Sequence, residues 1–230
     1  MKNRKLKNII VSGASRGIGF ALVKYFATNG HQVLALSRNV KPLQNVSENI
    51  TSLKVDITNE KDLDQVSEFI TKHWKQVDIL INNAGKLVHK PFAETTYQDF
   101  LTVYNVNVFA VATLTKLCLP FMKKGAHAIA ISSMGGIQGS LKFAGLSAYS
   151  SSKGAVITLY ELLAEEYKES GIAFNTLALG AVQTEMLAAA FPDYKAPITA
   201  EEMADYIAHF ALTGSKVYNG KVLQVSNTTP

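Results

Sequence analysis

Tyr149 and Lys153 stand four residues apart in the stretch SAYSSSK, at positions 147–153. Residues at i and i+4 share one face of a helix, so both side chains can point into the same cleft. A free tyrosine has a pKa of about 10, and a nearby ammonium lowers that pKa by stabilising the phenolate. Such a pair could exchange a proton with a carbonyl oxygen during hydride transfer. A Tyr–Lys pair alone is more often a surface contact, so the surrounding motifs decide between the two interpretations.

A glycine-rich loop, SGASRGIG at positions 12–19, stands between an expected strand and an expected helix. Gly13 permits a tight turn, Gly17 leaves room for the backbone to approach a phosphate, and Gly19 lets the helix pack close to the sheet. The helix N-terminus then offers free N–H groups and a positive dipole to a pyrophosphate. The loop alone is weak evidence, but its place between strand and helix predicts a dinucleotide site.

The residues after the second strand indicate which dinucleotide binds. NAD sites commonly place a carboxylate there to hold the ribose hydroxyls. This chain has Ser37, Arg38 and Asn39, with no acid. The planar fork of Arg38 could pair with a 2′-phosphate, reinforced by Arg16 from the glycine loop. The alternative is that both arginines are solvated surface residues; we predict NADP(H) rather than NAD(H).

Strand-like and helix-like patterns alternate along the whole chain. Continuous apolar strands between helices predict a parallel sheet covered on both faces, in a Rossmann-like, doubly wound α/β fold. With no repeat, linker or boundary, we expect one domain over residues 1–230, with a substrate lid at about 185–199. The expected strands are 8–12, 32–36, 53–55, 77–81, 127–132, 173–179 and 221–225, and the expected helices are 18–29, 58–74 (capped by Thr58), 98–123, 148–169 and 200–212.

Composition argues against several other classes of protein. The chain has 230 residues, of which 47% are hydrophobic and 18% charged, enough apolar matter for a large core. Its net charge of +5 includes four charges from the N-terminal Lys2, Arg4, Lys5 and Lys7, and no basic stripe interleaves with aromatics, so nucleic-acid binding is not expected. The sequence contains no run of 18 apolar residues, so no membrane helix is predicted. The single Cys118 favours a buried thiol in a reducing, cytoplasmic setting, and no metal site is predicted.

Taken in order, the motifs resemble the short-chain dehydrogenase/reductase family over nearly the whole chain. Beside the glycine loop and YSSSK at 149–153 stand NNAG at 82–85 and GAVQT at 180–184. The resemblance implies that Asp56 and Ile57 contact the adenine, that NNAG lies behind the cofactor, and that Lys153 also bonds the nicotinamide ribose. The cofactor-binding residues so expected are Gly13, Ser15, Arg16, Gly17, Ile18, Gly19, Arg38, Asp56, Ile57, Asn83, Ala84, Gly85, Tyr149, Lys153, Val182 and Thr184, the last two at the nicotinamide carboxamide.

The same resemblance implies a catalytic set of Asn107, Ser133, Tyr149 and Lys153. Ser133 would orient the substrate oxygen, with Ser132 as the fallback candidate. Asn107 would hold a water beside the lysine through its carbonyl group. Asn105 matches less well, and the alternative for Asn107 is a polar kink in a helix.

The sequence departs from the family at three places. Ser133 and Tyr149 are 16 positions apart, about three more than is common in the family, so the glycine-rich stretch between them should reshape one wall of the substrate pocket. Leu179 precedes Gly180 where the family usually has proline. The chain end, LQVSNTTP, lacks the glycine pair often seen in relatives.

The predicted function is reversible, NADP(H)-dependent reduction of a carbonyl to a secondary alcohol. The alternatives are a 3-oxoacyl-thioester reductase, or a catalytically silent NADP-binding sensor or scaffold. Apolar residues that could face the substrate are Leu141, Phe143, Met186, Leu187, Phe191 and Tyr194, while Lys142 and Lys195 either recognise an anion or are solvated. We expect a homodimer or homotetramer, with Val108, Val111, Leu159 and Leu163 in either the core or the interface.

Overall fold

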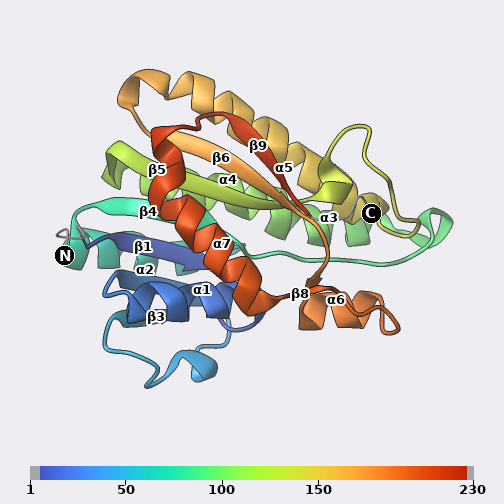
Figure 1. Cartoon of the computed structure of the whole chain (residues 1–230), viewed down its shortest axis with the longest axis horizontal. Helices are drawn as coiled ribbons and strands as arrows, with labels where there is room; N and C mark the ends of the chain where they lie inside the picture. Colours follow the sequence, from blue (N-terminus) through green and yellow to red (C-terminus); the bar gives the residue numbers. More distant parts are fainter. Residues whose placement is uncertain (1–5, 227–230) are drawn as a thin grey trace.

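The computed structural model describes residues 6–226, so the basic lead-in at Lys2, Arg4 and Lys5 lies outside the described residues. Its centre is a seven-stranded sheet in the order β3-β2-β1-β4-β5-β6-β9, with every neighbouring pair parallel (Figure 1). The strands are β1 Asn8–Ser12, β2 Gln32–Ser37, β3 Ile50–Lys54, β4 Val77–Asn82, β5 Met122–Ser133, β6 Ala173–Leu179 and β9 Lys221–Val225. The predicted doubly wound fold is confirmed.

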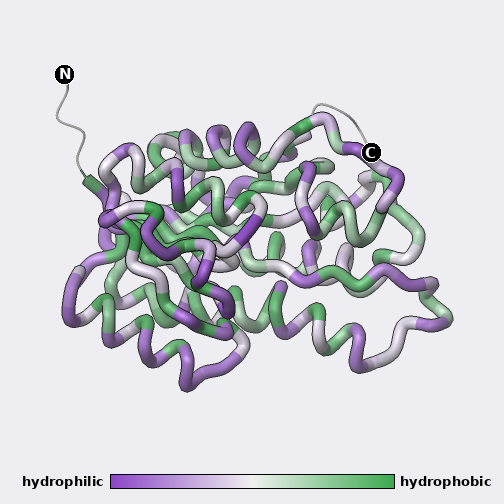
Figure 2. The backbone as a smooth tube through the Cα atoms, turned by 90° about the horizontal axis from the view of Figure 1, so that it is seen from below, coloured by the Kyte–Doolittle hydropathy of each residue, from purple (hydrophilic) through white to green (hydrophobic). Residues whose placement is uncertain are grey.

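Helices cover both faces of this sheet because successive strand residues point to opposite sides. Ile9 and Val11 of β1 pack into one core beneath α1 and α7, whereas Ile10 packs into the other, beneath α2, α4 and α5. Figure 1 shows α1 and α7 in front of the sheet, and Figure 2 shows apolar segments gathered inside with polar stretches on the outer helices. The helices are α1 Gly17–Thr28, α2 Glu60–Phe69, α3 Tyr97–Tyr104, α4 Ala110–Cys118, α5 Ser147–Glu166, α6 Glu185–Ala190 and α7 Ala200–Thr213.

Two helix predictions need correction. Thr58 does not cap α2: its hydroxyl donates to Asp56 at 2.7 Å, and Asn59 caps the helix by accepting from the N–H of Lys61 at 3.0 Å. The single helix expected over 98–123 is α3 and α4 joined by a π turn, Asn105–Phe109, and it ends earlier. Pro120 lacks the N–H needed to continue a helix, and β5 begins soon after it, five residues before the predicted start.

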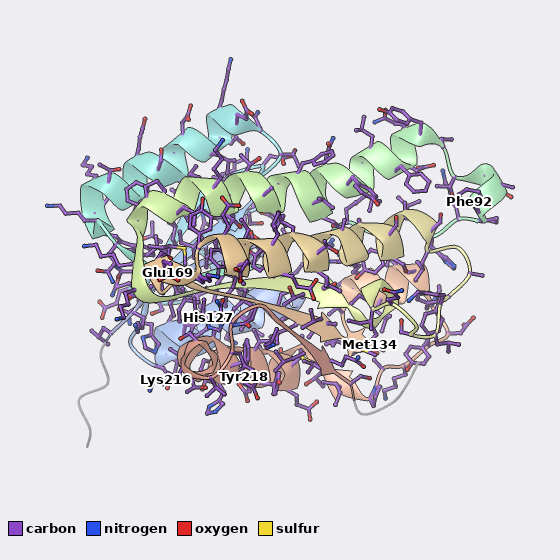
Figure 3. All side chains as sticks on the ribbon, turned by 90° about the horizontal axis from the view of Figure 1, so that it is seen from above. Phe92, His127, Met134, Glu169, Lys216 and Tyr218 are labelled. Atoms are coloured by element: carbon purple, nitrogen blue, oxygen red, sulfur yellow. The ribbon has the colours of Figure 1, made fainter. Side chains whose placement is uncertain are left out.

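The helical stretch Tyr97–Phe121 is long and apolar enough, by length and composition alone, to cross a membrane. In this fold it lies beside α5 on the sheet (Figure 3), and 33% of its most apolar window is buried. The core helix of an α/β domain meets the same criteria, because one side of it must be apolar to cover the strands.

The predicted lid region is a separate small unit beyond the carboxyl ends of the strands. β7 Val182–Gln183 pairs in parallel with β8 Ile198–Thr199, and α6 lies in the loop between them. Figure 1 shows α6 and β8 below the ends of β6 and β9, away from the main sheet. This places a short helix over the edge of the sheet where ligands bind in such folds.

Candidate active site

A cavity of about 1140 Å³ opens at the carboxyl ends of the strands. Met134, just after β5, lies at the cavity end of that strand, and His127 lies toward the other end (Figure 3). Every predicted site residue lines the cavity except Asn107: Gly13, Ser15, Arg16, Gly17, Ile18, Gly19, Arg38, Asp56, Ile57, Asn83, Ala84, Gly85, Ser133, Tyr149, Lys153, Val182 and Thr184. The volume slightly exceeds that of an ordinary ligand pocket, as a dinucleotide together with a substrate would need.

The glycine loop is held by the NNAG segment. The side-chain amide of Asn83 donates to the carbonyl oxygens of Ser12 at 3.0 Å and Gly13 at 3.2 Å. Gly13 has φ +70°, and a Cβ there would lie 2.8 Å from the Cα of Ala84. A Cβ on Gly19 would overlap the carbonyl oxygen of Gly13, so this glycine fits against the loop itself. Two motifs far apart in the sequence therefore form one backbone cradle.

The far end of the cavity carries positive charge. Arg16 and Arg38 line it, both exposed, and neither forms an ion pair with another described residue. Burial acts to raise the pKa of Asp56, but hydrogen bonds from Thr58 and the charge of Arg38 outweigh it and lower that pKa below its usual value. Asp56 therefore stays ionised at neutral pH, and the tip of β2 offers no carboxylate.

The residues predicted to transfer a proton lie together where β5 ends and α5 begins. Tyr149 and Lys153 lie on the first turns of α5, and the Nζ of Lys153 is 5.7 Å from the centroid of the Tyr149 ring. The side chain of Ser133 lies next to Tyr149 and acts to lower its pKa, and its Oγ accepts from the N–H of Gly135 at 3.3 Å. Lys153 is buried and donates to the carbonyl oxygen of Ile131 at 2.7 Å. Tyrosine, serine and lysine thus form one connected group inside the cavity.

The pKa shifts of the pair differ from the prediction. Burial raises the pKa of Tyr149, and the hydrogen bond with Ser133 opposes this only in part. Burial also lowers the pKa of Lys153 to about 8. The shift of the Tyr149 pKa is therefore opposite to the predicted direction, because desolvation of the phenolate is its largest cause. Tyr149 keeps its proton at neutral pH, which suits a proton donor to a carbonyl oxygen.

Asn107 acts behind the cavity wall. Its Oδ1 accepts from the N–H of Lys86 at 2.8 Å, and its Nδ2 donates to the carbonyl of Lys86 and the hydroxyl of Ser152, both at 2.9 Å. It is 1% exposed within the π turn, whereas Asn105 is only partly buried. Its side chain therefore joins the loop after β4 to α5, and the water-holding role of its carbonyl stays a prediction.

The two candidate serines differ in what their hydroxyls do. Ser132 donates to the carbonyl oxygen of Lys153 at 2.8 Å, and its side chain is buried. Both serines line the cavity, but the Oγ of Ser133 accepts from the N–H of Gly135 at 3.3 Å, so its own proton stays available to donate. Because the hydroxyl of Ser132 is already engaged by α5, the geometry favours Ser133 as the group beside a substrate oxygen.

A buried polar cluster beneath the site escaped the sequence analysis. The Nδ2 of Asn82 donates to the hydroxyl of Tyr160 at 2.7 Å and to that of Thr115 at 3.0 Å. The cluster ties β4 to α4 and α5, the elements that carry NNAG, Asn107 and the Tyr–Lys pair. Asn82 is the first residue of NNAG, but nothing in the helical pattern distinguishes Tyr160 from an ordinary core residue.

The other half of the cavity is mainly apolar. Of the predicted substrate-facing residues, Phe143, Met186, Leu187, Phe191 and Tyr194 line it, whereas Leu141 does not and is 58% exposed. Neither Lys142 nor Lys195 lines it, and the ammonium of Lys142 instead donates to its own loop. The sequence analysis missed Lys86, Leu87, Thr102, Val106, Met134 and Leu146, which also line it and come from loops and helix faces without a motif.

Comparison with known proteins places this geometry in context. The chain is 28% identical over 234 residues to the 3-oxoacyl-[acyl-carrier-protein] reductase FabG of Escherichia coli, covering 96% of each chain. It spans 33% and 62% of the length of two other curated relatives, to each of which it is 32% identical.

Solved structures share the fold at low identity. A short chain dehydrogenase from Burkholderia cenocepacia in complex with NADP is 24% identical, with TM-score 0.86 over 97% of both chains. A 3-ketoacyl-(acyl-carrier-protein) reductase from Brucella melitensis complexed with NADH is 22% identical, with TM-score 0.85 over 95% of this chain and 96% of that one. The family model for short chain dehydrogenases matches residues 7–195. The chain therefore belongs to the short-chain dehydrogenase/reductase family, as the motif order predicted.

Proposed function

We propose that this chain is an NADP(H)-dependent oxidoreductase that reversibly reduces a carbonyl group to a secondary alcohol. The observation that carries the proposal is the grouping of Ser133, Tyr149 and Lys153, with the Lys153 Nζ 5.7 Å from the Tyr149 ring centroid, in the same cavity as the glycine loop. These three groups can take part in the reduction of a carbonyl group only if a hydride donor binds next to them. The cradle of Gly13 and Gly19, where a Cβ would collide with backbone, fits the close approach of a dinucleotide phosphate.

Each residue has a distinct task in the proposed reaction. The bound nicotinamide supplies the hydride. Tyr149 gives its proton to the carbonyl oxygen in reduction and accepts it back in oxidation. Ser133 hydrogen-bonds the same oxygen and so fixes the distance over which the proton moves. Lys153, buried close to the phenol ring, stabilises the phenolate that remains.

NADP(H) is proposed over NAD(H) because of the charge at the adenosine end. Arg38 and Arg16 are exposed there and unpaired among the described residues, and positions 37–39 carry no acid. A guanidinium binds a phosphate through two parallel hydrogen bonds, which a bare ribose hydroxyl cannot accept. Asp56 lies further along, hydrogen-bonded to Thr58, and would face the adenine.

Two other functions compete with this proposal. A 3-oxoacyl-thioester reductase is favoured by the 28% identity to the Escherichia coli enzyme. A catalytically silent NADP-binding sensor or scaffold would need the same cradle without turnover. The complete Ser–Tyr–Lys group disfavours the silent protein, and the apolar cavity is compatible with either kind of substrate.

A carbonyl panel followed by NADPH absorbance tests the proposal. It should contain simple ketones, aldehydes and 3-oxoacyl thioesters, each run with NADPH and, in parallel, with NADH. We expect consumption of NADPH with at least one ketone or aldehyde, and a slower rate with NADH. Turnover confined to thioesters would favour the alternative enzyme. Tight NADPH binding with no turnover across the panel would favour the silent protein.

The solution assembly and cellular setting are also proposals. Large apolar side chains are exposed on the outer side of α3–α4 and α5: Tyr97 by 80%, Phe109 by 53% and Leu162 by 60%. A homodimer formed through this face would remove them from water, which supports that assembly. Of the residues named from the sequence for this face, Val111 is only 4% exposed and belongs to the core. A strictly monomeric mass in solution would contradict the dimer. Burial raises the pKa of the Cys118 thiol to about 12, so the thiol is inert, as a reducing cytoplasm would allow.

A further inference from the structure

The segment between β5 and α5 forms one wall of the cavity. The carbonyl oxygen of Gly145 accepts a hydrogen bond from the N–H of Lys90 at 3.0 Å. Gly145 has φ +83°, and a Cβ there would overlap the ring of His89. The segment is therefore packed against the loop that follows β4 at Gly145, two residues after Phe143, whose side chain is 43% exposed.

Three aromatic rings from three separate segments meet at this wall. Phe143 and Phe191 pack edge to face, with ring centroids 6.4 Å apart and planes at 62°. The ring of His89 also packs against Phe191, with ring centroids 4.9 Å apart and ring planes at 39°. We call His89, Phe143 and Phe191 the aromatic wall. Phe143 and Phe191 both line the cavity, so a substrate would meet ring surface there.

The remaining substrate-side lining gives the aromatic wall its context. Leu87, Val106, Leu146, Met186 and Leu187 are apolar, so they bind any apolar body by burial without regard to its electronic character. Rings differ, because their negative faces and positive edges favour edge-to-face contact with another ring. Besides Tyr149 and Tyr194, the rings of Phe143 and Phe191 are therefore the parts of the described lining that can distinguish an aryl group from a saturated group of equal size.

We propose that Phe143 and Phe191 select carbonyl substrates that carry an aryl group next to the reacting carbon. This inference deepens the proposed function and rests on it. Phe143 reaches the cavity from the segment between β5 and α5, and Phe191 from the end of α6, so the preference is set by residues outside the Ser133, Tyr149 and Lys153 group.

A matched ketone pair tests the inference. Acetophenone and cyclohexyl methyl ketone have similar size and differ in the aromaticity of one ring. We expect the wild-type protein with NADPH to show kcat/KM higher for acetophenone by roughly twofold to tenfold, the range that one ring pair contributes. In Phe143→Leu and Phe191→Leu, which keep an apolar side chain, this ratio should fall toward one. Leu141→Ala, on the same segment but outside the cavity, should keep the wild-type ratio.

A binding measurement separates this inference from the proposed function. The dissociation constants of both ketones, measured by ligand-observed NMR on the protein saturated with NADP+, do not depend on turnover. Tighter binding of acetophenone that is lost in Phe143→Leu supports the aromatic wall even if no carbonyl is reduced, a result that would overturn only the proposed function. Equal binding of the two ketones, or a preference unchanged in both leucine variants, overturns the inference while leaving NADPH consumption with other carbonyls unaffected.

Discussion

The two halves of the cavity are built in different ways. The cofactor half is made of closely packed backbone: the side-chain amide of Asn83 ties the glycine loop to NNAG, and Gly13 and Gly19 leave no room for a Cβ. The substrate half is made of side chains from separate loops, such as Phe143 and Phe191. A backbone cradle demands fixed residues at fixed spacing, whereas packed side chains can be exchanged. We therefore expect changes near the cofactor and the proton donor to cost far more than changes in the substrate half.

Tyr149→Phe should have the largest effect, because it removes the proton donor at the junction of the two halves. We expect kcat to fall by about 10³-fold, the usual scale of general acid catalysis, while the dissociation constant for NADPH changes less than about twofold. Stopped turnover with unchanged cofactor binding, measured by NADPH absorbance and fluorescence, checks this.

Tyr194→Phe is the matched control, since that tyrosine also lines the cavity but lies in the lid. It should keep most of the activity. Comparable large losses in both variants would show that the loss is not specific to Tyr149, and small losses in both would show that Tyr149 is not the required proton donor.

Lys153→Met should change stability in a pH-dependent way. Burial lowers the pKa of Lys153 from 10.5 to about 8, so between these values the unfolded chain binds a proton that the folded chain does not. Wild-type stability therefore rises with pH across this window. At pH 7 the charged lysine is buried at a cost of about 3 kcal/mol relative to its neutral form, which follows from about 1.4 kcal/mol per pKa unit.

Methionine carries no such cost, although it removes the hydrogen bond to the carbonyl of Ile131, so the variant should compare most favourably with the wild type at pH 7. Its stability relative to the wild type should fall as pH rises from 8 toward 10.5. Urea unfolding at a series of pH values measures this. A difference in stability that stays constant with pH would mean that Lys153 is not desolvated in the folded protein. Lys61→Met, at an exposed position on α2, should show no comparable pH dependence.

Arg38→Ser sharpens the comparison within the cofactor half, because it alters a side chain there and leaves the backbone cradle intact. We expect the KM for NADPH to rise roughly tenfold to a hundredfold, the scale of a charge-assisted hydrogen bond to phosphate, with little change for NADH. Steady-state kinetics with both cofactors measure this. Lys41→Ser removes the same charge nearby without touching the cavity and should leave both KM values close to wild type. Equal losses for NADPH and NADH would contradict a 2′-phosphate contact.

The same division explains what the sequence could predict. The parallel sheet, the cradle and the place of Tyr149 follow from spacing, because regular elements and backbone contacts impose it. The aromatic wall could not be derived, since Phe143 and Phe191 are 48 positions apart and meet only through loop packing. The predicted direction of the Tyr149 pKa shift was wrong for a related reason. The spacing in the sequence brings the ammonium near the phenol, but only the fold determines how deeply the phenol is buried. The observed helix ends differ from the predicted ones at two places, where Asn59 caps the start of α2 and Pro120 follows the end of α4.

Leu187→Ala should have the smallest effect of these substitutions, and it tests the substrate half directly. Leu187 lines the cavity from α6 and is only partly buried, so its truncation removes apolar contact with a substrate and opens little cavity in the core. We expect the KM for an apolar ketone to rise roughly twofold to fivefold, on the order of 1 kcal/mol, with the KM for NADPH unchanged. Kinetics with both substrates varied in turn measure the two values. If the KM for NADPH rose as much as the KM for the ketone, the lid helix α6 would contact the cofactor as well. The side-chain wall would then belong to both halves of the cavity, not to the substrate half alone.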